Sequence, residues 1–316
     1  MAAVWSIAPV GRGGHDRRTP EEAVSPCRLD VSKASGMPSA DEVRDGQRAA
    51  WARLSASWDK WDAIIMDQLG PVGDAMIERL AVAEDQQHLD IASGTGEPGL
   101  SIARLAPRGR VVLTDLSPQM LEVAARRALA QGVDNVETEV CSADDLPFGD
   151  ASFDSVSVRF GYMFFPDMAK ATAEFARVLR PGGRLCAAVW VDPGDNPWTS
   201  IAMEAISSET ELPPPDPDGP SMYRCAAPGQ VAALYTAAGL CDVEEWDVDI
   251  VLVTQSPDEY WQMISEHVSL ASAALQRVDE PARARMGARA MANVSAFEHD
   301  GKVRVPGKAR CIVGTA

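Results

Sequence analysis

Long apolar runs and clustered cysteines are both missing from this chain of 316 residues. No stretch approaches the roughly 18 apolar residues that a membrane-spanning helix needs. The six cysteines are scattered, with no C-x-x-C pair and no cysteine–histidine cluster at zinc spacing, which argues against a structural metal ion. Most of them sit in apolar runs, as reduced intracellular thiols do. We therefore expect a cytoplasmic protein with no membrane span and no metal.

Basic residues are scarce relative to acidic ones. The chain has 29 lysines and arginines against 46 aspartates and glutamates, so its formal net charge is −17. Because nucleic-acid binding needs clustered lysine and arginine for the phosphates, we expect no nucleic-acid partner. A neutral or cationic small ligand is compatible with this charge.

Composition and hydrophobic periodicity divide the chain into four parts. Residues 1–40 are rich in Gly, Pro, Ser and Arg and predict a disordered tail. Residues 41–82 predict an N-terminal helical lid, and strand and helix patterns alternate through 83–195, the order of a parallel sheet covered by helices. Residues 196–316 predict a helical insertion followed by the last strands. The expected fold class is α/β: a doubly wound, Rossmann-like sheet of seven strands, mostly parallel, with the last strand antiparallel.

The expected elements follow from apolar periodicity and from proline and glycine stop signals. The predicted strands cover 87–93, 110–115, 135–142, 153–160, 184–191, 242–253 and 309–315. Predicted helices after the first one cover about 71–82, 98–106, 117–132, 168–180, 228–240, 257–275 and 281–297. The proline-rich stretch 211–220 predicts a stiff loop.

A glycine-rich loop follows the first predicted strand, in the stretch L-D-I-A-S-G-T-G-E-P-G-L (89–100). Gly94, Gly96 and Gly99 form G-x-G-x-x-G, a pattern that several nucleotide-binding classes share. Asp115 ends the next strand, about 20 residues further on, at the spacing of a carboxylate that binds ribose hydroxyls. The pattern therefore predicts an adenosine-bearing ligand: NAD(P), FAD or S-adenosylmethionine.

The charge of the loop distinguishes these ligands. Asp90 comes just before the loop and Glu97 lies inside it. A pyrophosphate prefers bare backbone N–H groups at a helix N-terminus, and two like charges about 4 Å apart repel by about 1 kcal/mol in water and about 4 kcal/mol at an effective dielectric of 20. S-adenosylmethionine has no phosphate and carries a sulfonium and an ammonium, which nearby acids stabilise. The loop favours S-adenosylmethionine.

Four motifs in order carry a family resemblance: D-I-A-S-G-T-G-E-P-G (90–99), V-V-L-T-D-L-S-P-Q-M-L (111–121), D-L-P-F-G-D-A-S-F-D (145–154) and R-V-L-R-P-G-G-R-L (177–185). This series resembles the class I S-adenosylmethionine-dependent methyltransferases, of the branch that includes the ubiquinone and menaquinone C-methylases. The resemblance covers about 45–195 well and the remainder loosely. It implies an enzyme that moves a methyl group to a small-molecule acceptor by in-line displacement.

The resemblance also implies which residues bind the cofactor. Those that match the loop around the methionine part are Asp90, Ser93, Gly94, Thr95 and Gly96. Those that match the ribose-binding acid and the two side chains flanking the adenine are Asp115, Leu116 and Met120. The end of the fourth strand, behind the methionine part, matches at Arg159 and Phe160. Trp58 stands where relatives often carry a tyrosine in a helix that caps the cofactor.

The adenine end departs from the family pattern. Relatives usually place an aspartate four residues before the leucine of L-P-F, where it accepts a hydrogen bond from the adenine amino group. This chain has Ser142 at that position, followed by Ala143 and Asp144. A serine hydroxyl can accept the same hydrogen bond without a charge, and Asp144 is the alternative acceptor.

The acceptor and its general base are less defined. Aromatic and methionine residues expected around the pocket favour an apolar or aromatic acceptor; they are Tyr162, Met163, Phe164, Trp198, Met222, Tyr223, Tyr260, Trp261 and Met263. Imidazole titrates near neutral pH, so His267 is the candidate base, with His299 as a second choice, whereas His88 is expected to be structural. Two other functions stay open, a non-catalytic binding module with this fold and an NAD-dependent oxidoreductase, and so do a monomer and a homodimer.

Overall fold

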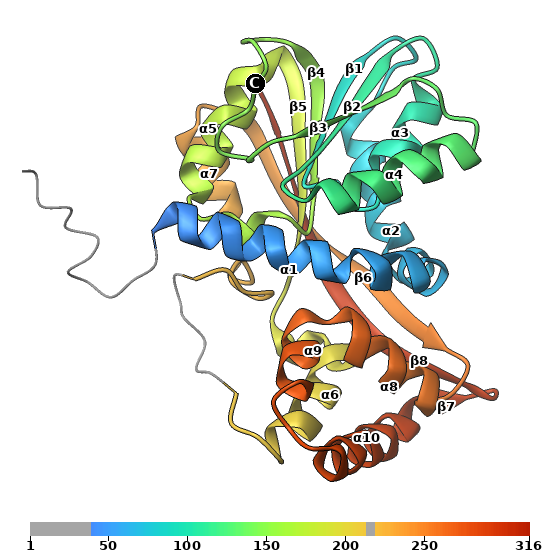
Figure 1. Cartoon of the computed structure of the whole chain (residues 1–316). Helices are drawn as coiled ribbons and strands as arrows, with labels where there is room; N and C mark the ends of the chain where they lie inside the picture. Colours follow the sequence, from blue (N-terminus) through green and yellow to red (C-terminus); the bar gives the residue numbers. More distant parts are fainter. Residues whose placement is uncertain (1–38, 213–218) are drawn as a thin grey trace, which may run out of the picture. The chain divides into compact units, whose positions relative to one another are not determined.

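The computed structural model describes residues 39–212 and 219–316 (Figure 1). Within it, Ser39–Ala316 form one compact unit. Residues 1–38 of the predicted tail and 213–218 of the predicted stiff loop lie outside the described residues, whereas Ser39 and Ala40 cap and begin the first helix. No helix among the described residues combines the length and the apolar character needed to cross a membrane.

A sheet of eight strands organises this unit. The strands are β1 (Gln87–Ile91), β2 (Arg110–Asp115), β3 (Val136–Val140), β4 (Phe153–Arg159), β5 (Leu179–Trp190), β6 (Cys241–Thr254), β7 (Glu298–His299) and β8 (Lys302–Thr315). Their order is β3-β2-β1-β4-β5-β8-β6, and β7 pairs with β8. The first five strands in this order are parallel to one another, and β8 is antiparallel to β5 and to β6.

The predicted α/β class and the doubly wound sheet are confirmed, but the strand count of seven is wrong. The chain turns back at Asp300 and Gly301, both with positive φ, and so adds the short strand β7 in front of β8. Two consecutive left-handed residues form the tight turn that suits a hairpin. The predicted last strand begins only at residue 309, whereas β8 begins at Lys302, so the sequence pattern does not indicate this turn.

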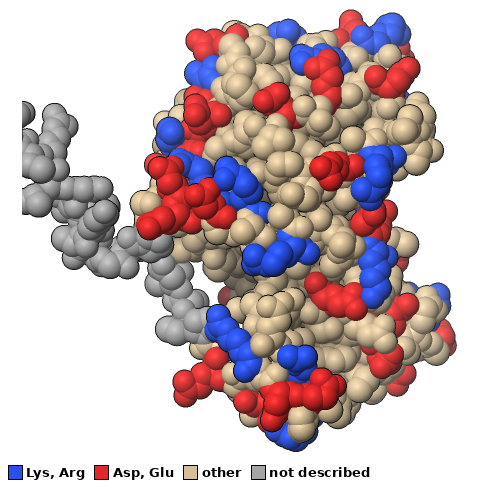
Figure 2. Space-filling model, viewed as in Figure 1, with Lys and Arg blue, Asp and Glu red and all other residues tan. Residues whose placement is uncertain are grey.

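Helices cover both faces of the sheet. They are α1 (Ala40–Lys60), α2 (Asp62–Leu80), α3 (Gly99–Leu105), α4 (Pro118–Ala130), α5 (Met168–Val178), α6 (Pro197–Ser207), α7 (Gln230–Ala237), α8 (Pro257–His267), α9 (Ser269–Leu275) and α10 (Glu280–Val294), with the short 3₁₀ turn η2 (Tyr162–Phe164). In Figure 1, α2, α3 and α4 lie on one side of the strands and α5 and α7 on the other. Figure 2 shows acidic and basic side chains interspersed over the face seen in this view.

Among the predicted boundaries that differ from the structure, three illustrate the physical reasons. The second helix begins at Asp62, and Pro71 lies inside it, because a buried apolar stripe continues on both sides of the proline and outweighs one missing hydrogen bond. The helix predicted for 168–180 ends at Val178, and β5 already includes the Pro-Gly-Gly stretch. The helix predicted for 257–275 breaks at Val268, whose backbone is extended.

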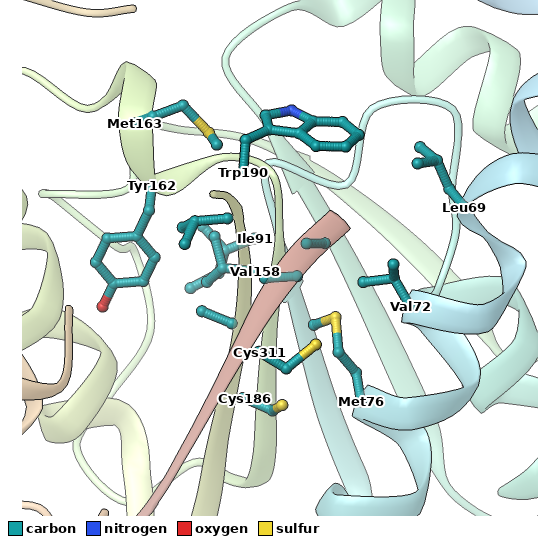
Figure 3. Packing of buried hydrophobic residues seen from close by; sticks show 14 of the residues in the cluster. Leu69, Val72, Met76, Ile91, Val158, Tyr162, Met163, Cys186, Trp190 and Cys311 are labelled. Carbon is teal, nitrogen blue, oxygen red and sulfur yellow. The ribbon is translucent and has the colours of Figure 1, made fainter. Parts of the chain in front are cut away.

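One part of the core lies between α2 and the strands. Buried side chains of the helix face buried side chains of the sheet in Figure 3; they are Leu69, Val72 and Met76 from α2, and Ile91, Val158, Cys186 and Cys311 from the strands. Each such side chain contributes about 1.5–3 kcal/mol to folding when it is fully buried. This packing holds the carboxyl ends of the parallel strands in fixed positions, where ligands bind in folds of this type.

A two-stranded extension carries the helical insertion. β5 pairs with β8 only over Ala309–Thr315, whereas β6 pairs with β8 as far as Val303. The outer halves of β6 and β8 therefore project past the parallel strands. Helices α6, α8, α9 and α10 pack on one another and on this extension, as Figure 1 shows.

Candidate functional site

The loop between β1 and α3 turns sharply and leaves space above it. Ala92, Gly94 and Gly96 all have positive φ, a region that L side chains rarely adopt. A Cβ added to Gly96 would lie 2.8 Å from Leu100, so this glycine packs closely against α3, whereas a Cβ on Gly94 would meet nothing within 4 Å. Gly96 thus serves the packing of the loop, and Gly94 borders open space.

Two buried side chains of the loop complete this turn. Ser93 is 5% exposed and Thr95 is 3% exposed. The hydroxyl oxygen of Ser93 is buried and has no hydrogen-bond partner among the described residues. A buried hydroxyl without a partner is costly, so this group is available to a ligand of the loop.

Asp90 connects the strand before the loop to the helix after it. Its side chain is fully buried; Oδ1 accepts a hydrogen bond of 2.5 Å from Ser157 Oγ, and Oδ2 accepts one of 3.0 Å from the backbone N–H of Gly99. Burial raises the pKa of Asp90 to about 7, against the effect of these two hydrogen bonds. The carboxylate therefore joins the end of β1 to the start of α3.

Asp115 lies at the end of β2 and is bonded to the loop. Its Oδ2 accepts a hydrogen bond of 3.0 Å from the N–H of Gly94, and its Oδ1 accepts one of 2.8 Å from the N–H of Ser117. Burial raises the pKa of Asp115 to about 6. Leu116 beside it is half-buried, and Met120, in the first turn of α4, is buried.

Ser142 and Asp144 form one hydrogen-bonded unit after β3. Ser142 Oγ donates to Asp144 Oδ1 over 2.5 Å, and Arg44 of α1 pairs with Asp144 Oδ2 at 2.7 Å, with Lys170 at 3.7 Å. Burial raises the pKa of Asp144, but the hydrogen bonds from Arg44 and Ser142 outweigh it and keep that pKa below its usual value. Asp144 therefore faces α1, and Ala143 beside it is half-buried.

The end of β4 carries a charged group with no ionic partner. Arg159 makes no ion pair within 4 Å among the described residues, and its Nη2 lies 3.8 Å from the sulfur of Met66. Loss of hydration lowers the pKa of Arg159, while Glu97 and other carboxylates nearby oppose this. The next residue, Phe160, has a φ of 59°, and its ring stacks on Trp190 at 4.2 Å.

An aromatic cluster, formed by Trp51, Trp58, Phe164 and His267, joins α1 to η2 and α8. The ring centroids of Trp51 and Phe164 are 5.1 Å apart, and those of Trp58 and His267 are 4.4 Å apart. The indole nitrogen of Trp58 and Nδ1 of His267 are buried without a hydrogen-bond partner among the described residues. Burial lowers the pKa of His267 to about 4, so this imidazole is neutral at physiological pH.

Helix α1 crosses the carboxyl ends of the parallel strands. Its N-terminal half contacts the segment after β3 through Asp144, its middle contacts η2 after β4, and its C-terminal end contacts α4 and α8. Figure 1 shows it between the sheet with its helices and the group α6, α8, α9 and α10. The ion pairs that join it to other elements are Arg44–Asp144, Arg126–Asp59, Arg127–Asp59 and Lys60–Glu266.

Several residues expected near the acceptor lie elsewhere. Tyr162, Met163, Tyr260 and Met263 are fully buried in the core, so their apolar character says nothing about an acceptor. Trp261 lines a separate hollow of about 290 Å³ among α8, α9 and α10. His299 is exposed in the hairpin of β7 and β8.

Other functional contacts had no signal in the sequence. Arg44 meets Asp144 from a position 100 residues away, and no local pattern encodes such a pair. His88 is fully buried and bonds to the hydroxyls of Ser155 and Ser157, which agrees with the structural role expected for it, but its link to Asp90 through Ser157 was not foreseen.

Comparisons with known proteins agree with this geometry. Residues 48–204 match the ubiE/COQ5 methyltransferase family. An uncharacterized protein of Mycobacterium bovis is 31% identical over 210 residues, which are 65% of this chain and 75% of that protein. A demethylmenaquinone methyltransferase of Thermus thermophilus is 46% identical over 99 residues, 31% of this chain and 44% of that enzyme.

A solved structure shares the fold. Phosphoethanolamine N-methyltransferase 2 of Haemonchus contortus, in complex with phosphomonomethylethanolamine and S-adenosylhomocysteine, is similar with a TM-score of 0.54 at 17% identity, over 88% of this chain and 60% of that chain.

Proposed function

This chain belongs to the ubiE/COQ5 methyltransferase family and is an S-adenosylmethionine-dependent methyltransferase, and from this premise we propose that it methylates an apolar or aromatic small molecule held beneath α1. The observation that carries the proposal is the aromatic cluster, in which two buried polar atoms, Nε1 of Trp58 and Nδ1 of His267, have no partner among the described residues. An apolar site with a few convergent polar groups is typical of small-molecule binding.

The residues at the loop fit S-adenosylmethionine. The open space at Gly94 and the hydroxyl of Ser93, which has no partner among the described residues, suit a ligand close to the backbone. Asp115 suits ribose hydroxyls, and the guanidinium of Arg159, which forms no ion pair within the described part of the chain, suits the carboxylate of the methionine part. The proposed cofactor-binding set is Asp90, Ser93, Gly94, Thr95, Gly96, Asp115, Leu116, Met120, Ser142, Ala143, Asp144, Arg159, Phe160 and Trp58, with Asp90 acting through the loop.

S-adenosylmethionine, when bound, supplies a methyl group on a cationic sulfur, so the chain's own residues mainly orient the acceptor and exclude water. Helix α1 would exclude water because it crosses the open ends of the strands. Fixing reactants in a productive geometry is worth about 7–11 kcal/mol at best. The rings of Trp51, Trp58 and Phe164 would hold the acceptor, and the indole N–H of Trp58 would donate a hydrogen bond to it.

His267 is the proposed general base. Its neutral Nδ1 can accept a hydrogen bond from an O–H or N–H of the acceptor and take the proton when methylation makes that group acidic. Its lowered pKa makes it a weak base, and a weak base is sufficient for a strongly acidic proton. General base catalysis contributes about 10²–10⁴ to the rate.

Calorimetric titration with S-adenosylhomocysteine tests the cofactor site. Binding at micromolar strength in the wild type, lost in Asp115→Ala and kept in Asp134→Ala, supports it; Asp134 is exposed after α4 and makes a matched control. Binding of NAD(H) in place of S-adenosylhomocysteine would overturn it.

Transfer of labelled methyl groups to a panel of phenols, quinols and aliphatic amines tests the acceptor. We expect turnover with aromatic members, a kcat about 10²-fold lower in His267→Ala with unchanged affinity for S-adenosylhomocysteine, and no change in His299→Ala. Turnover confined to hydrophilic aliphatic amines contradicts the proposal. A cytoplasmic location and a monomer or homodimer stay predictions.

A further inference from the structure

Four polar side chains form a continuous chain inside the sheet, between β1 and β4. His88 pairs in register with Ser155, and Asp90 with Ser157, and all four are 0% exposed. Nδ1 of His88 lies 2.8 Å from Ser155 Oγ and its Nε2 lies 2.9 Å from Ser157 Oγ. Ser157 Oγ is 2.5 Å from Asp90 Oδ1, and Asp90 Oδ2 is 3.0 Å from the N–H of Gly99.

The hydrogen bonds of this chain have one consistent direction. A hydroxyl has a single proton and an ionised carboxylate has none. Burial raises the pKa of Asp90 to about 7, so the carboxylate is ionised above this pH. There Ser157 gives its proton to Asp90 and can only accept from His88, so the proton of His88 is on Nε2. Nδ1 then bears a lone pair, which accepts from Ser155. Burial also lowers the pKa of His88 to about 3, so the ring stays neutral.

We propose that these four residues, the polar relay, position the cofactor loop: His88, as the Nε2–H tautomer, orients Ser157, Ser157 holds Asp90, and Asp90 holds the backbone at Gly99. The inference rests on the proposed role of the loop in binding S-adenosylmethionine. Its members are positioning residues, since Asp90 acts on the ligand through the loop.

The contacts at Gly99 show why the carboxylate must be held in place. A Cβ added to Gly99 would lie 2.9 Å from Asp90 Oδ2, so the start of α3 sits directly against this oxygen. A rotation of the Asp90 side chain would therefore shift the start of α3 and with it the turn at Gly94 and Gly96. The hydrogen bond from Ser157 opposes this rotation, and the N–H of His88, which donates to a lone pair of Ser157, keeps the hydroxyl proton directed at Asp90.

Stability alone gives no reason for four polar groups at this depth. Leu89 and Val156, which alternate with them on the same strands, are apolar and equally buried. A buried polar group costs free energy unless it is fully bonded, and replacing a bonded buried pair by apolar groups of the same shape is often neutral. Every side chain of the relay is hydrogen-bonded, and its last member, Asp90, is bonded to the backbone at Gly99. We therefore attribute the four polar groups to the positioning of the loop.

The tautomer of His88 is a test that needs no cofactor. Long-range ¹H–¹⁵N spectra of the labelled full chain, recorded at about pH 8 to about pH 9 where Asp90 is ionised, should show a protonated Nε2 and a bare Nδ1. The imidazole of His88 should not become doubly protonated between about pH 5 and about pH 9. A proton on Nδ1, or a titration near the ordinary histidine pKa, would overturn the relay. This result does not depend on whether the loop binds S-adenosylmethionine.

Variants of the relay test its effect on the loop. His88→Phe keeps the ring but neither hydrogen bond, and should raise the Kd for S-adenosylhomocysteine about tenfold or more. His88→Gln is the rescue variant, because its amide can donate to Ser157 and accept from Ser155, and it should bind nearly as the wild type does. In turnover assays the loss in His88→Phe should fall on KM for S-adenosylmethionine rather than on kcat.

Ser157→Ala and Ser155→Ala form a matched pair in case the phenylalanine variant does not fold. Both serines are fully buried on β4, but only Ser157 touches Asp90. We expect about a tenfold loss of affinity for S-adenosylhomocysteine in Ser157→Ala and a smaller loss in Ser155→Ala. Equal affinities in the wild type and Ser157→Ala would refute the relay and leave the proposed function intact, whereas a wild type that does not bind the ligand would refute the proposed function.

Discussion

At the scale of single residues, Asp115 is the side chain whose ionisation should control cofactor affinity. Burial raises its pKa to about 6, and ribose hydroxyls donate hydrogen bonds to the ionised form. Affinity for S-adenosylhomocysteine should therefore fall as the pH drops through about 6, and binding near this pH should release a proton. Calorimetry between about pH 5 and about pH 8, in buffers of different ionisation enthalpy, measures both effects.

Asp115→Asn provides the control for this pH dependence. It should bind weakly at every pH and lose the step near pH 6, while any step near pH 7 that comes from Asp90, whose pKa is raised to about 7, remains. An asparagine variant that keeps the affinity of the wild type would contradict the role of Asp115.

A second prediction concerns Ser142, because related methyltransferases usually have an aspartate at this position. In this chain the position is 2.5 Å from the carboxylate of Asp144, so Ser142→Asp would place two like charges together at a cost of about 4 kcal/mol at an effective dielectric of 20. The substitution should weaken binding of S-adenosylhomocysteine about tenfold or more. The double variant Ser142→Asp/Asp144→Ser should recover it, as calorimetry can measure; tighter binding by the single variant would contradict this.

At the scale of elements, α1 should be held in place chiefly by Arg44. This side chain reaches the buried Asp144, whereas Arg48, one turn further on, pairs only with the exposed Asp45 of the same helix. Arg44→Ala leaves the buried carboxylate of Asp144 with the hydrogen bond from Ser142 and with Lys170, at 3.7 Å, as its one cationic neighbour among the described residues. Hydrogen exchange of the α1 amides should become about tenfold faster, and affinity for S-adenosylhomocysteine should drop.

Arg48→Ala is the matched control for the α1 prediction. It removes the same side chain from the same helix, and exposed pairs of this kind contribute about 0.2–1 kcal/mol or less. Exchange rates and affinity should stay close to those of the wild type. Similar effects of the two variants would mean that helix stability, rather than the contact with Asp144, holds α1.

The elements that could be predicted are those with strong local signals. β2 has the expected bounds, and α4 begins after Ser117, within one residue of the predicted start, with the Ser117 hydroxyl as its cap. The second helix is predicted from about 71, whereas α2 begins at Asp62. A proline inside a helix is disfavoured locally, and the tertiary burial that outweighs this effect cannot be read from the local sequence. The β7–β8 turn and the break at Val268 also depend on packing between distant segments.

In the candidate site, too, features within one local unit could be predicted and contacts between distant segments could not. Gly94 and Asp115 belong to one βαβ unit, and their spacing alone predicted that both serve the same ligand. The structure places them side by side, joined by a hydrogen bond of 3.0 Å. The aromatic cluster draws on α1, η2 and α8, whose relative positions no local pattern contains. His267 was predicted only as the candidate base, and no local pattern shows that it packs on Trp58 with a buried Nδ1.

At the scale of the whole molecule, the net charge of −17 should affect the two forms of the cofactor differently. S-adenosylmethionine carries a net positive charge because of its sulfonium, and S-adenosylhomocysteine is neutral overall. An excess of acidic groups attracts the cation over long range, and salt screens this attraction, with a Debye length near 30 Å at 0.01 M and 3 Å at 1 M. Raising the salt between these limits should weaken binding of S-adenosylmethionine a further two- to fivefold or so relative to S-adenosylhomocysteine.

A charge variant separates this long-range effect from contacts in the site. Four exposed acids that form no ion pair in the structure, Asp74, Asp85, Asp134 and Asp195, can be changed to lysine, which brings the net charge from −17 to −9. None belongs to the proposed cofactor-binding set. If the field of the whole chain acts, the difference in salt dependence between the two ligands should shrink in this variant, while affinity at high salt stays that of the wild type. If the difference is unchanged, the acids that attract S-adenosylmethionine lie close to its binding site. Asp90 and Glu97 beside the loop are then sufficient to account for the difference in salt dependence.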